Sequence, residues 1–370
     1  TYVFNRGDGQ DTILDSRSGQ NPWWGGYDTS TRTDTVQFGA GIAASDLNAR
    51  RSGNDLVLTI TDPANSATAD QITLKNWTLG NQYHIETLAF ADGTMLGTSD
   101  TEFDTSGSDL VSGTSADSLL FAGAGDDVLQ GGAGNDLVSD TSGNNLLDGG
   151  AGNDWLSGGS GNDLLMGRAG NDSIKTGAGT GVLAFNAGDG NDTVDAIAGT
   201  NHAISLGGGI RYADLTLGKQ NDNLVVETGN GESLTLKNWY AAAANHTVLN
   251  LQVVAEAMAG YDANSSDPLL NKKVETFDFQ GLVGAFDAAR AADPGITSWA
   301  LTNALAQYHL SGSDDAALGG DLAYQYGLNG SLAGIGLTHA QDALNDPQFG
   351  AQAQALHPLS SLQDGAVRLS

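Results

Sequence analysis

The stretch GGAGNDWLSGGSGNDLLMG, residues 149–167, repeats itself after nine residues and places Asp154 and Asp163 at the same position of successive copies. The nine-residue period runs without a gap from 104 to 184. Its copies begin at residues 104, 113, 122, 131, 140, 149, 158, 167 and 176. A fixed internal period is typical of architectures in which each unit packs only against its neighbours.

The composition indicates which partner the chain needs. There are 44 acidic and 15 basic side chains, which give a formal net charge of -29. Such a charge repels nucleic acid and anionic membranes, so the expected partner is a cation. The 52 glycines and 6 prolines follow no collagen-like period and favour a turn-rich β architecture. Because 39% of the residues are hydrophobic, the chain can bury cores and is not expected to be disordered.

Targeting and redox features are sparse. Cysteine is absent, which excludes disulfides and thiolate metal sites. No run approaches the ~18 apolar residues of a membrane span. The first residues, TYVFNRGDGQ, lack the basic and apolar segments of a signal peptide, so Thr1 is expected to lie inside a longer chain.

A second, longer repeat flanks the array. YVFNRGDGQDTI at 2–13 matches LAFNAGDGNDTV at 183–194, and the order of later matches is the same in both copies. The later matches are FGAGIAASDL (38–47) with LGGGIRYADL (206–215), ITLKNW (72–77) with LTLKNW (234–239), and IETLAF (85–90) with VETFDF (274–279). This alignment places an insertion at 240–273 in the second copy, and its apolar segment VLNLQVVAEAMAGY predicts a helix.

The nine-residue unit reads as a turn followed by a strand. Glycines at the first, second and fourth positions allow a tight turn, and a large aliphatic residue at the eighth position lies in a short strand. Two units make one coil, and neighbouring coils pair as parallel strands about 4.8 Å apart. Aspartates 18 residues apart therefore face each other along one edge.

Oxygen ligands at this spacing favour calcium. A hard cation with oxygen ligands at about 2.4 Å fits between two carboxylates, and the carbonyls of the glycine turns can complete its shell. Magnesium demands a stricter octahedron. Zinc prefers His or Cys, and the array from 104 to 175 contains neither.

The units resemble the nonapeptides of RTX (repeats-in-toxin) secreted bacterial proteins, whose pattern is G-G-x-G-x-D-x-U-x. Seven of the first eight units have Gly at the fourth position, and six have Asp at the sixth. The flanking copies are similar to haemolysin-type calcium-binding related segments, so the resemblance covers about residues 1–280. It implies a calcium-binding parallel β-roll in a protein exported by a type I secretion machinery.

The resemblance also implies the ligands. The sixth-position residues form two rows: Asp109, Asp127, Asn145 and Asp163 on one edge, and Ser118, Asp136, Asp154 and Asp172 on the other. The complete pairs are 109 with 127, 136 with 154, and 154 with 172. Ser118, Asn145 and Gly181 depart from the pattern, and sites that pass through Asn145 are weaker. Carbonyls are expected from Gly132, Gly134, Gly150, Gly152, Gly159 and Gly161, and the motifs with Asp8 and Asp11, and with Asp189 and Asp192, are expected to extend the roll.

Other interpretations of these residues are less favoured. A phosphate-binding loop needs GK[ST] after its glycines, and none follows here. Aspartates that merely cap turns remain an alternative. However, eleven aspartates accompany only Arg168 and Lys175 between 104 and 175, and such stacked charge needs compensation. DANSSD at 262–267 lacks the Gly and Glu of an EF-hand, and each LKNW is expected to end a strand with a core Trp.

Enzyme motifs are missing from the sequence. There is no G-x-S-x-G, no H-E-x-x-H and no cysteine nucleophile, so we expect a chain that is not an enzyme. The histidines are scattered without metal-ligand spacing and are expected at the surface or satisfied in the core: His84, His202, His246, His309, His339 and His357. A carboxylate pair acting as a glycosidase stays open, because any two of the 44 acids could meet in the fold.

The last segment differs in composition. From 282 onward LVGAFDAARAA, TSWALTNALAQYHL and DAALGGDLAYQYGL have helical apolar spacing. The terminal SSLQDGAVRLS is expected to be the uncleaved address for type I secretion, and the helical region is also a candidate cap for the open end of the roll.

The expected fold is mostly β: a parallel β-roll flanked by two related β modules, with a helical C-terminal region. The expected segments are 1–99, 100–184, 185–280 and 281–370. The expected function is calcium-dependent folding and secretion of a larger extracellular bacterial protein, with several Ca²⁺ ions and without nucleic acid as a partner. Two alternatives stay open: a cell-surface adhesin with a glycan or other ligand, and the tail of a secreted hydrolase or epimerase.

Overall fold

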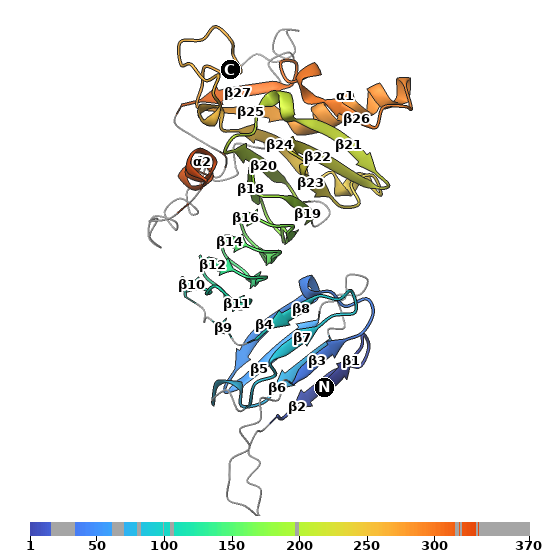
Figure 1. The fold of residues 1–370 in the computed structure, drawn as a ribbon, viewed down its shortest axis with the longest axis vertical. Helices are drawn as coiled ribbons and strands as arrows, with labels where there is room; N and C mark the ends of the chain where they lie inside the picture. The colour runs from blue at the N-terminus through green and yellow to red at the C-terminus, as the bar shows by residue number, and fades with distance from the viewer. Residues whose placement is uncertain are drawn as a thin grey trace, which may run out of the picture.

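The computed structural model describes residues 1–15, 34–60, 70–79, 83–98, 100–103, 107–196, 200–314, 318, 320–330 and 332. Figure 1 shows a column of short stacked strands with one β module beside its lower end and a second continuing its upper end. The regular secondary structure of the described residues is mostly strand, with two α-helices, α1 (Phe279–Ala292) and α2 (Gly320–Asn329). The predicted fold class, a parallel β-roll with flanking β modules, is therefore confirmed.

The roll consists of two sheets whose strands alternate along the chain. One sheet runs β10 (Leu110–Ser112), β12 (Val128–Ala133), β14 (Leu146–Ala151), β16 (Leu164–Ala169), β18 (Val182–Asn186), β20 (His202–Gly207), β24 (Val248–Val253), β25 (Val274–Asp278) and β27 (His309–Ser313). The other runs β9 (Asp100–Phe103), β11 (Ser118–Phe121), β13 (Leu137–Ser139), β15 (Trp155–Ser157), β17 (Ser173–Lys175), β19 (Asn191–Asp195), β23 (Glu232–Leu236), β22 (Asn223–Gly229), β21 (Thr216–Gln220) and β26 (Ser298–Ala300).

The register of the roll is the one that the period predicts. Leu146 pairs with Val128 on one side and with Leu164 on the other, all in parallel strands. Each coil therefore lies over the coil 18 residues before it, which places sixth-position residues of alternate units in line.

The first module has two sheets of its own. They run β1 (Tyr2–Phe4), β3 (Thr35–Phe38), β7 (Thr87–Ala89), β8 (Met95–Gly97), and β2 (Gln10–Ile13), β6 (Asp70–Leu74), β5 (Asp55–Ile60), β4 (Leu47–Ser52). The second module instead continues the two sheets of the roll, because β18 pairs with β16 and β19 pairs with β17. The four-segment division predicted from the sequence remains a prediction, and the structure joins its second and third segments through these strand pairs.

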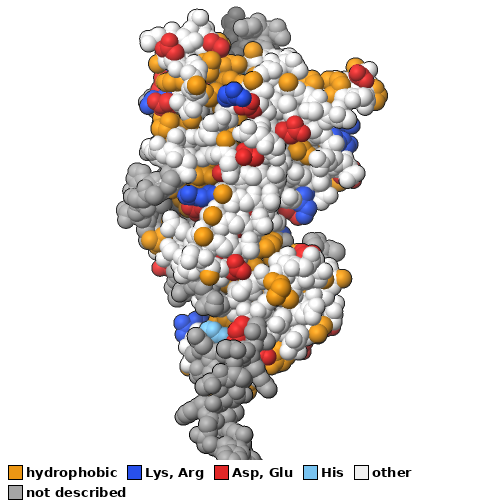
Figure 2. Space-filling model, viewed as in Figure 1, with side chains coloured by type: hydrophobic (Ala, Val, Ile, Leu, Met, Phe, Trp, Pro, Cys, Tyr) orange, Lys and Arg blue, Asp and Glu red, His pale blue; other side chains and the backbone are white. Residues whose placement is uncertain are grey.

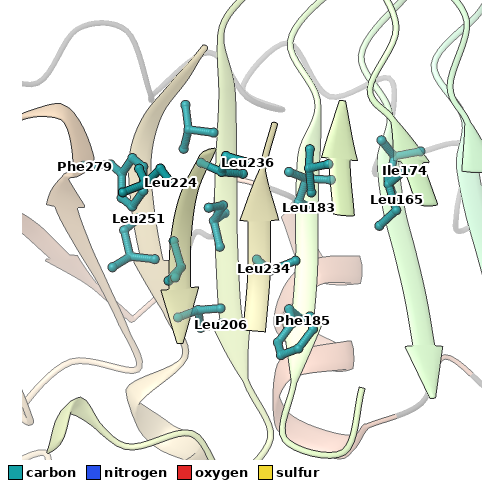
Figure 3. Close-up of a cluster of buried hydrophobic side chains, with 14 of the residues drawn as sticks. Leu165, Ile174, Leu183, Phe185, Leu206, Leu224, Leu234, Leu236, Leu251 and Phe279 are labelled. Carbon is teal, nitrogen blue, oxygen red and sulfur yellow. The ribbon is translucent and has the colours of Figure 1, made fainter. Parts of the chain in front are cut away.

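Eighth-position aliphatic residues fill the inside of the roll. Leu129, Leu147 and Leu165 are fully buried there. Figure 3 shows this core passing without interruption from Leu165 and Ile174 in the roll to Leu251 and Phe279 in the second module. One continuous apolar core therefore stabilises both parts, because each Å² of apolar surface removed from water contributes about 25 cal/mol.

Seventh-position residues point outward, and each outer face of the roll is covered over part of its length, while Leu110 in the first coil stays exposed. On one face Leu146 and Leu164 belong to the same apolar cluster as Leu322 and Tyr326 of α2. On the opposite face Leu119 and Leu137 join the core of the first module, and Trp155 packs against that core. The roll therefore has an inner core and an apolar cluster on each outer face, which explains why seventh positions are often apolar.

The helix predicted for VLNLQVVAEAMAGY is wrong. Residues 248–253 form strand β24, parallel to β20, and only a short 3-10 turn (Ala255–Ala257) follows. The side chains alternate: Leu251 and Val253 enter the core, whereas Gln252 donates a hydrogen bond to Ser205 Oγ at 2.7 Å. A period of two was therefore present in the sequence, and pairing with β20 decided the structure.

The match between IETLAF and VETFDF is also wrong. β7, which lies within the first segment, runs parallel to β3, whereas β25, which lies within the second, runs antiparallel to β24. The counterpart of β7 is therefore β24, and the counterpart of β8 is β25. The additional residues of the second copy lie between β24 and β25, at 254–273, and not from 240.

The C-terminal region is only partly helical. LVGAFDAARAA lies in α1, and LAYQYGL lies in α2. TSWALTNALAQYHL, in contrast, forms β26, a 3-10 turn (Leu301–Asn303) and the start of β27. Leu301 and Leu305 are buried in the main core, while β26 pairs with β21, so tertiary contacts override the helical spacing. The secretion address SSLQDGAVRLS lies outside the described residues.

Candidate calcium-binding sites

The glycine turns bring successive coils into close contact. Gly152 has φ 135°, and a Cβ there would overlap the carbonyl oxygen of Gly134 in the preceding coil. Only glycine fits at that position, because both the backbone angle and the approach exclude a side chain. All six glycines predicted to supply carbonyls have positive φ: Gly132, Gly134, Gly150, Gly152, Gly159 and Gly161.

The sixth-position side chains form two buried rows beside these turns. In the first row Asp136 N donates to Asp154 Oδ1 at 2.8 Å, and Asp154 N donates to Asp172 Oδ1 at 2.8 Å. Asp172 N continues the row to Asp192 Oδ1 at 2.9 Å. The row starts at Ser118, whose N–H donates to Asp136 Oδ1 at 2.7 Å. Asp192 therefore extends the row, as predicted.

The second row has the same geometry. Asp109 N donates to Asp127 Oδ1 at 2.8 Å, Asp127 N to Asn145 Oδ1 at 2.9 Å, and Asn145 N to Asp163 Oδ1 at 3.0 Å. Asn145 is fully buried and uses its amide oxygen as the aspartates use one carboxylate oxygen. From Asp127 and Asp136 onward, each sixth-position side chain thus uses one oxygen to bind the backbone N–H of the coil before it.

The other carboxylate oxygen is the one that suits a cation. Asp154 Oδ2, Asp163 Oδ2 and Asp172 Oδ2 are buried and accept no hydrogen bond. Asp154 Oδ2 faces the turn of its own unit, since a Cβ on Gly149 would lie 2.5 Å from it. A buried carboxylate oxygen without a partner costs several kcal/mol, so a compensating cation is strongly favoured there.

Burial makes these carboxylates hard to ionise. It raises the pKa of Asp154 to about 8, with further contributions from the charges of Asp172 and Asp136. Burial likewise raises the pKa of Asp163 to about 8 and that of Asp172 to about 7. Burial and the Asp172 charge raise the pKa of Asp192 to about 9. A bound cation would reverse these shifts by stabilising the charged form.

The donor set fits calcium. The site residues offer only carboxylate, amide and carbonyl oxygens, which are the ligands of hard cations. Across the described ranges, no three His, Asp or Glu side chains converge on one point. The rows therefore supply one or two carboxylates to each site, and backbone carbonyls of the glycine turns would supply the other ligands.

Asp140 is a buried acid that the sequence analysis missed. It stands at the first position of the unit that has Asn145 at its sixth, where five of the other eight units have glycine. Its side chain is 1% exposed, and neither oxygen accepts a hydrogen bond. Burial, followed by the side-chain interaction with Asp127 and the charges of Asp127 and Asp163, raises its pKa to about 9. The unit therefore keeps a carboxylate near the second row despite Asn145.

The fifth positions form outer ladders that were also missed. Asn153 N donates to Asn135 Oδ1 at 2.8 Å, and Asn171 N donates to Asn153 Oδ1 at 2.8 Å. A matching ladder joins Asn144 to Asp126 and Asn162 to Asn144 on the other edge. The recurrence of Asn or Asp before the sixth position was the available signal. The side-chain oxygen of a fifth-position residue thus accepts from the coil that follows, whereas that of a sixth-position residue accepts from the coil before it.

The structure leaves Asp11 apart from the rows. Asp11 is exposed on β2, at the edge of the first module, whereas Asp192 is 2% exposed in the roll. Asp189, near Asp192, accepts a 2.8 Å hydrogen bond from the Tyr326 hydroxyl of α2. Figure 2 shows acidic side chains scattered over one face and not gathered in a stripe along the roll, because the two rows point inward.

The described histidines have structural partners. His84 stacks on Trp77 at 4.2 Å between ring centroids, and His246 stacks on Trp239 at 4.7 Å. His202 is buried and accepts a hydrogen bond from Gly181 N at 3.0 Å, and burial lowers its pKa to about 4. His309 lies 2.7 Å from Glu275 in the buried pairing of β27 with β25. His339 and His357 lie outside the described residues.

A separate cavity lies in the second module. It has a volume of about 360 Å³ and is lined by Asn191, Asp214, Gln220, Val225, Glu227, Gly229, Gly231, Glu232 and Ser233. Its carboxylates favour hydroxyl or ammonium groups over anions. Among the predicted calcium ligands, only Asp192 is adjacent in sequence to a residue that lines the cavity, Asn191.

Comparisons with known proteins agree with the repeat pattern. Residues 103–138 and 139–180 match the RTX calcium-binding nonapeptide repeat (4 copies), and residues 55–100 match the haemolysin-type calcium binding protein related domain. The chain therefore carries RTX calcium-binding repeats, as the resemblance implied. The structure has no helix long and apolar enough to span a membrane among the residues it describes.

Two further comparisons are less informative. No curated protein matches the chain. Among solved structures, the crystal structure of extracellular lipase LipA from Serratia marcescens is similar, with 17% identity and a TM-score of 0.18. The match covers 65% of this chain and 34% of the lipase chain, so this chain spans about a third of that protein.

Proposed function

We propose that this chain is a calcium-binding RTX region that folds outside the cell when Ca²⁺ binds, and that it supports type I secretion and extracellular folding of a larger bacterial protein. Cytosolic calcium is far below the ~10⁻⁴ to 10⁻³ M at which extracellular sites fill. The buried aspartates then repel one another, and the roll stays open for export. Outside, calcium neutralises the rows and the coils stack.

One observation carries this proposal. Asp154 Oδ2, Asp163 Oδ2 and Asp172 Oδ2 are buried beside glycine turns without a hydrogen-bond donor. Each carboxylate already uses its other oxygen to accept a backbone N–H of the preceding coil. A cation bound at the free oxygens would therefore join the same coils that the hydrogen bonds join, so metal binding and stacking are one event.

The proposed ligands are the sixth-position residues and the glycine-turn carbonyls. Carboxylates would come from Asp109, Asp127, Asp136, Asp154, Asp163, Asp172 and Asp192, an amide oxygen from Asn145, and carbonyls from Gly132, Gly134, Gly150, Gly152, Gly159 and Gly161. Asp140 is an additional candidate beside Asn145. Asp11 is a candidate only where another coil reaches β2.

A calcium titration followed by circular dichroism tests the folding role. Calcium at millimolar concentration should convert a poorly ordered chain into β structure, and each site should add RT ln(1 + [Ca²⁺]/Kd) to the free energy of unfolding. Magnesium should do much less, because it requires a stricter octahedron. Equal folding by both ions would contradict the proposed coordination.

An export assay in a type I system tests the secretion role. Deleting residues 360–370, which hold the proposed address, should abolish export and leave the calcium midpoint of the purified chain unchanged. Deleting 281–370 should abolish export and also weaken calcium-induced folding, because Leu282, Phe286 and Leu301 belong to the main core. Normal export of the shorter deletion would place the address elsewhere.

A further inference from the structure

The two flanking modules are the same structure built twice. The first has sheet orders β1-β3-β7-β8 and β2-β6-β5-β4, and the second repeats them as β18-β20-β24-β25 and β19-β23-β22-β21. The strand directions correspond as well: β1 with β3 and β18 with β20 are parallel, and β7 with β8 and β24 with β25 are antiparallel.

Local contacts repeat with the strands. Asn5 N donates to Asp8 Oδ2 at 2.7 Å, and Asn186 N donates to Asp189 Oδ2 at 2.7 Å. The stacked pair Trp77 and His84 has its counterpart in Trp239 and His246. Residues at equivalent positions of the two copies therefore have equivalent surroundings within each module.

The sheets of the two copies end differently at both edges, and the edge formed by the first strands is the one that meets the roll in the second copy. In the second copy, β18 and β19 pair with β16 and β17, which form the last coil of the roll. In the first copy, β1 and β2 are the terminal strands of their sheets within the described residues. Figure 1 shows them on the side of the first module that faces away from the roll.

Side chains at the open edge are exposed where their counterparts are covered. Tyr2 is 36% exposed and Val3 is 66% exposed. Their counterparts Leu183 and Ala184 are 1% and 6% exposed, because the core of the roll and α2 cover them. An edge with exposed apolar side chains and unpaired backbone groups is a ready template for another strand.

The backbone and Asp11 are arranged to receive a coil. In the second copy, Thr193 N donates to Asp172 O at 2.8 Å, and Asp192 Oδ1 accepts from Asp172 N at 2.9 Å. The corresponding groups of the first copy are Thr12 N and the Asp11 carboxylate, both on β2. The edge strand β2 thus carries the same residue types, Asp and Thr, as the strand β19 that pairs with the roll.

We propose that β1 and β2 form a docking edge for the last coil of a nonapeptide roll that is joined to the N-terminal side of Tyr2. In the second copy, residues 176–181 make this connection between β17 and β18. The free coil of this chain's own roll is excluded, because β9 and β10 already pair with β11 and β12 on the side that docking requires. The inference rests on the proposed calcium-dependent folding.

A fusion tests the docking edge. Residues 140–181 are placed directly before Thr1 of the full chain, which reproduces the junction between Gly181 and Val182. With calcium, hydrogen exchange at the amides of Tyr2–Phe4 and Gln10–Ile13 should slow at least tenfold relative to the chain without the added residues. The number of bound calcium ions per chain should rise.

Thr12→Pro is the matched control, since proline is accepted in an edge strand but lacks the N–H that docking uses. It should abolish the slow exchange in the fusion and leave melting of the unfused chain unchanged. Asp11→Ala provides a second variant if the proline disturbs β2. Unchanged exchange at β1 and β2 in the fusion overturns the docking edge. Loss of calcium-dependent protection in the native roll, read from β12 to β16 in the same sample, overturns the proposed function instead.

Discussion

Asp154 illustrates how much chemistry one sixth-position residue carries. It accepts a hydrogen bond from Asp136 N, donates its own N–H to Asp172 Oδ1, and keeps Oδ2 buried without a donor. The sixth-position rows could be predicted from the period alone. The recurrence of Asn or Asp at the fifth position marked the ladders, but their bonding direction and the role of Asp140 could not be predicted, because these depend on which way each turn faces in three dimensions.

Asp154→Asn should change stability in opposite directions with and without calcium. The amide keeps the hydrogen bond and removes a buried carboxylate, so in EDTA at neutral pH the variant should gain about 1–3 kcal/mol. In calcium it should lose about 2.7 kcal/mol for each weakened site at 100-fold excess over Kd. Denaturant unfolding in both buffers measures this. Asn153→Ala, which breaks only an outer ladder bond, should lose about 1 kcal/mol in both.

The calcium-free roll should become more stable as pH falls. The pKa values of Asp154 and Asp163 are raised to about 8 and that of Asp192 to about 9, well above the value of about 3.9 in an unfolded chain. The unfolded state therefore loses its protons first, and stability present at about pH 4 is lost as pH rises through 7 to 9. Thermal melting in EDTA from pH 9 to pH 5 should show a rising midpoint; a flat or falling one would contradict the burial of these acids.

Gly152→Ala should destabilise more than Gly188→Ala, although both glycines have positive φ. At Gly188 a Cβ meets nothing within 4 Å, so the cost is the backbone term of about 1–2 kcal/mol. At Gly152 the Cβ overlaps Gly134 O, so the coils must also separate. Chemical unfolding in calcium compares the two, and equal losses would argue against close stacking of the turns.

At the scale of elements, the sequence pattern predicts some strands, and tertiary contacts decide others. Eighth-position aliphatics predicted the inner strands correctly, because the period of the roll and the period of the sequence coincide. The segment 248–253 was predicted as a helix from its apolar run, yet β20 recruits it as a strand and Asn250 and Gln252 mark the outward face. The shared spacing from Trp77 to His84 and from Trp239 to His246 would have given the correct alignment of the two copies.

The helix α2 should stabilise the roll by packing on its outer face. Leu322 is fully buried in the apolar cluster that joins α2 to β18 and β20, and Arg168, which pairs with Asp148, lies 5.4 Å from the Tyr326 ring. Leu322→Ala should therefore lower the free energy of unfolding by about 2–5 kcal/mol. Leu110→Ala, at a 53% exposed position of the first coil, should change it by less than about 0.5 kcal/mol. Equal melting of both variants in calcium would mean that α2 contributes no stability.

At the scale of the molecule, calcium sites and core belong to one column. The inner core runs from Val111 through the roll into Phe286 of α1, and both rows of acids run beside it. Sequence periodicity predicted the column and its register. It did not predict that the second module continues the same sheets while the first stands beside them, because that difference arises from which strand edges pair in space.

Hydrogen exchange in calcium and in EDTA tests the central claim most directly. Amides of β12, β14 and β16 should be protected in calcium and exchange rapidly in EDTA at pH 8, because ionised acids keep the coils apart. Amides of β5, whose Leu58 and Ile60 are fully buried in the core of the first module, should be protected in both buffers. Equal protection of β12, β14 and β16 in the two buffers would contradict calcium-dependent folding of the roll.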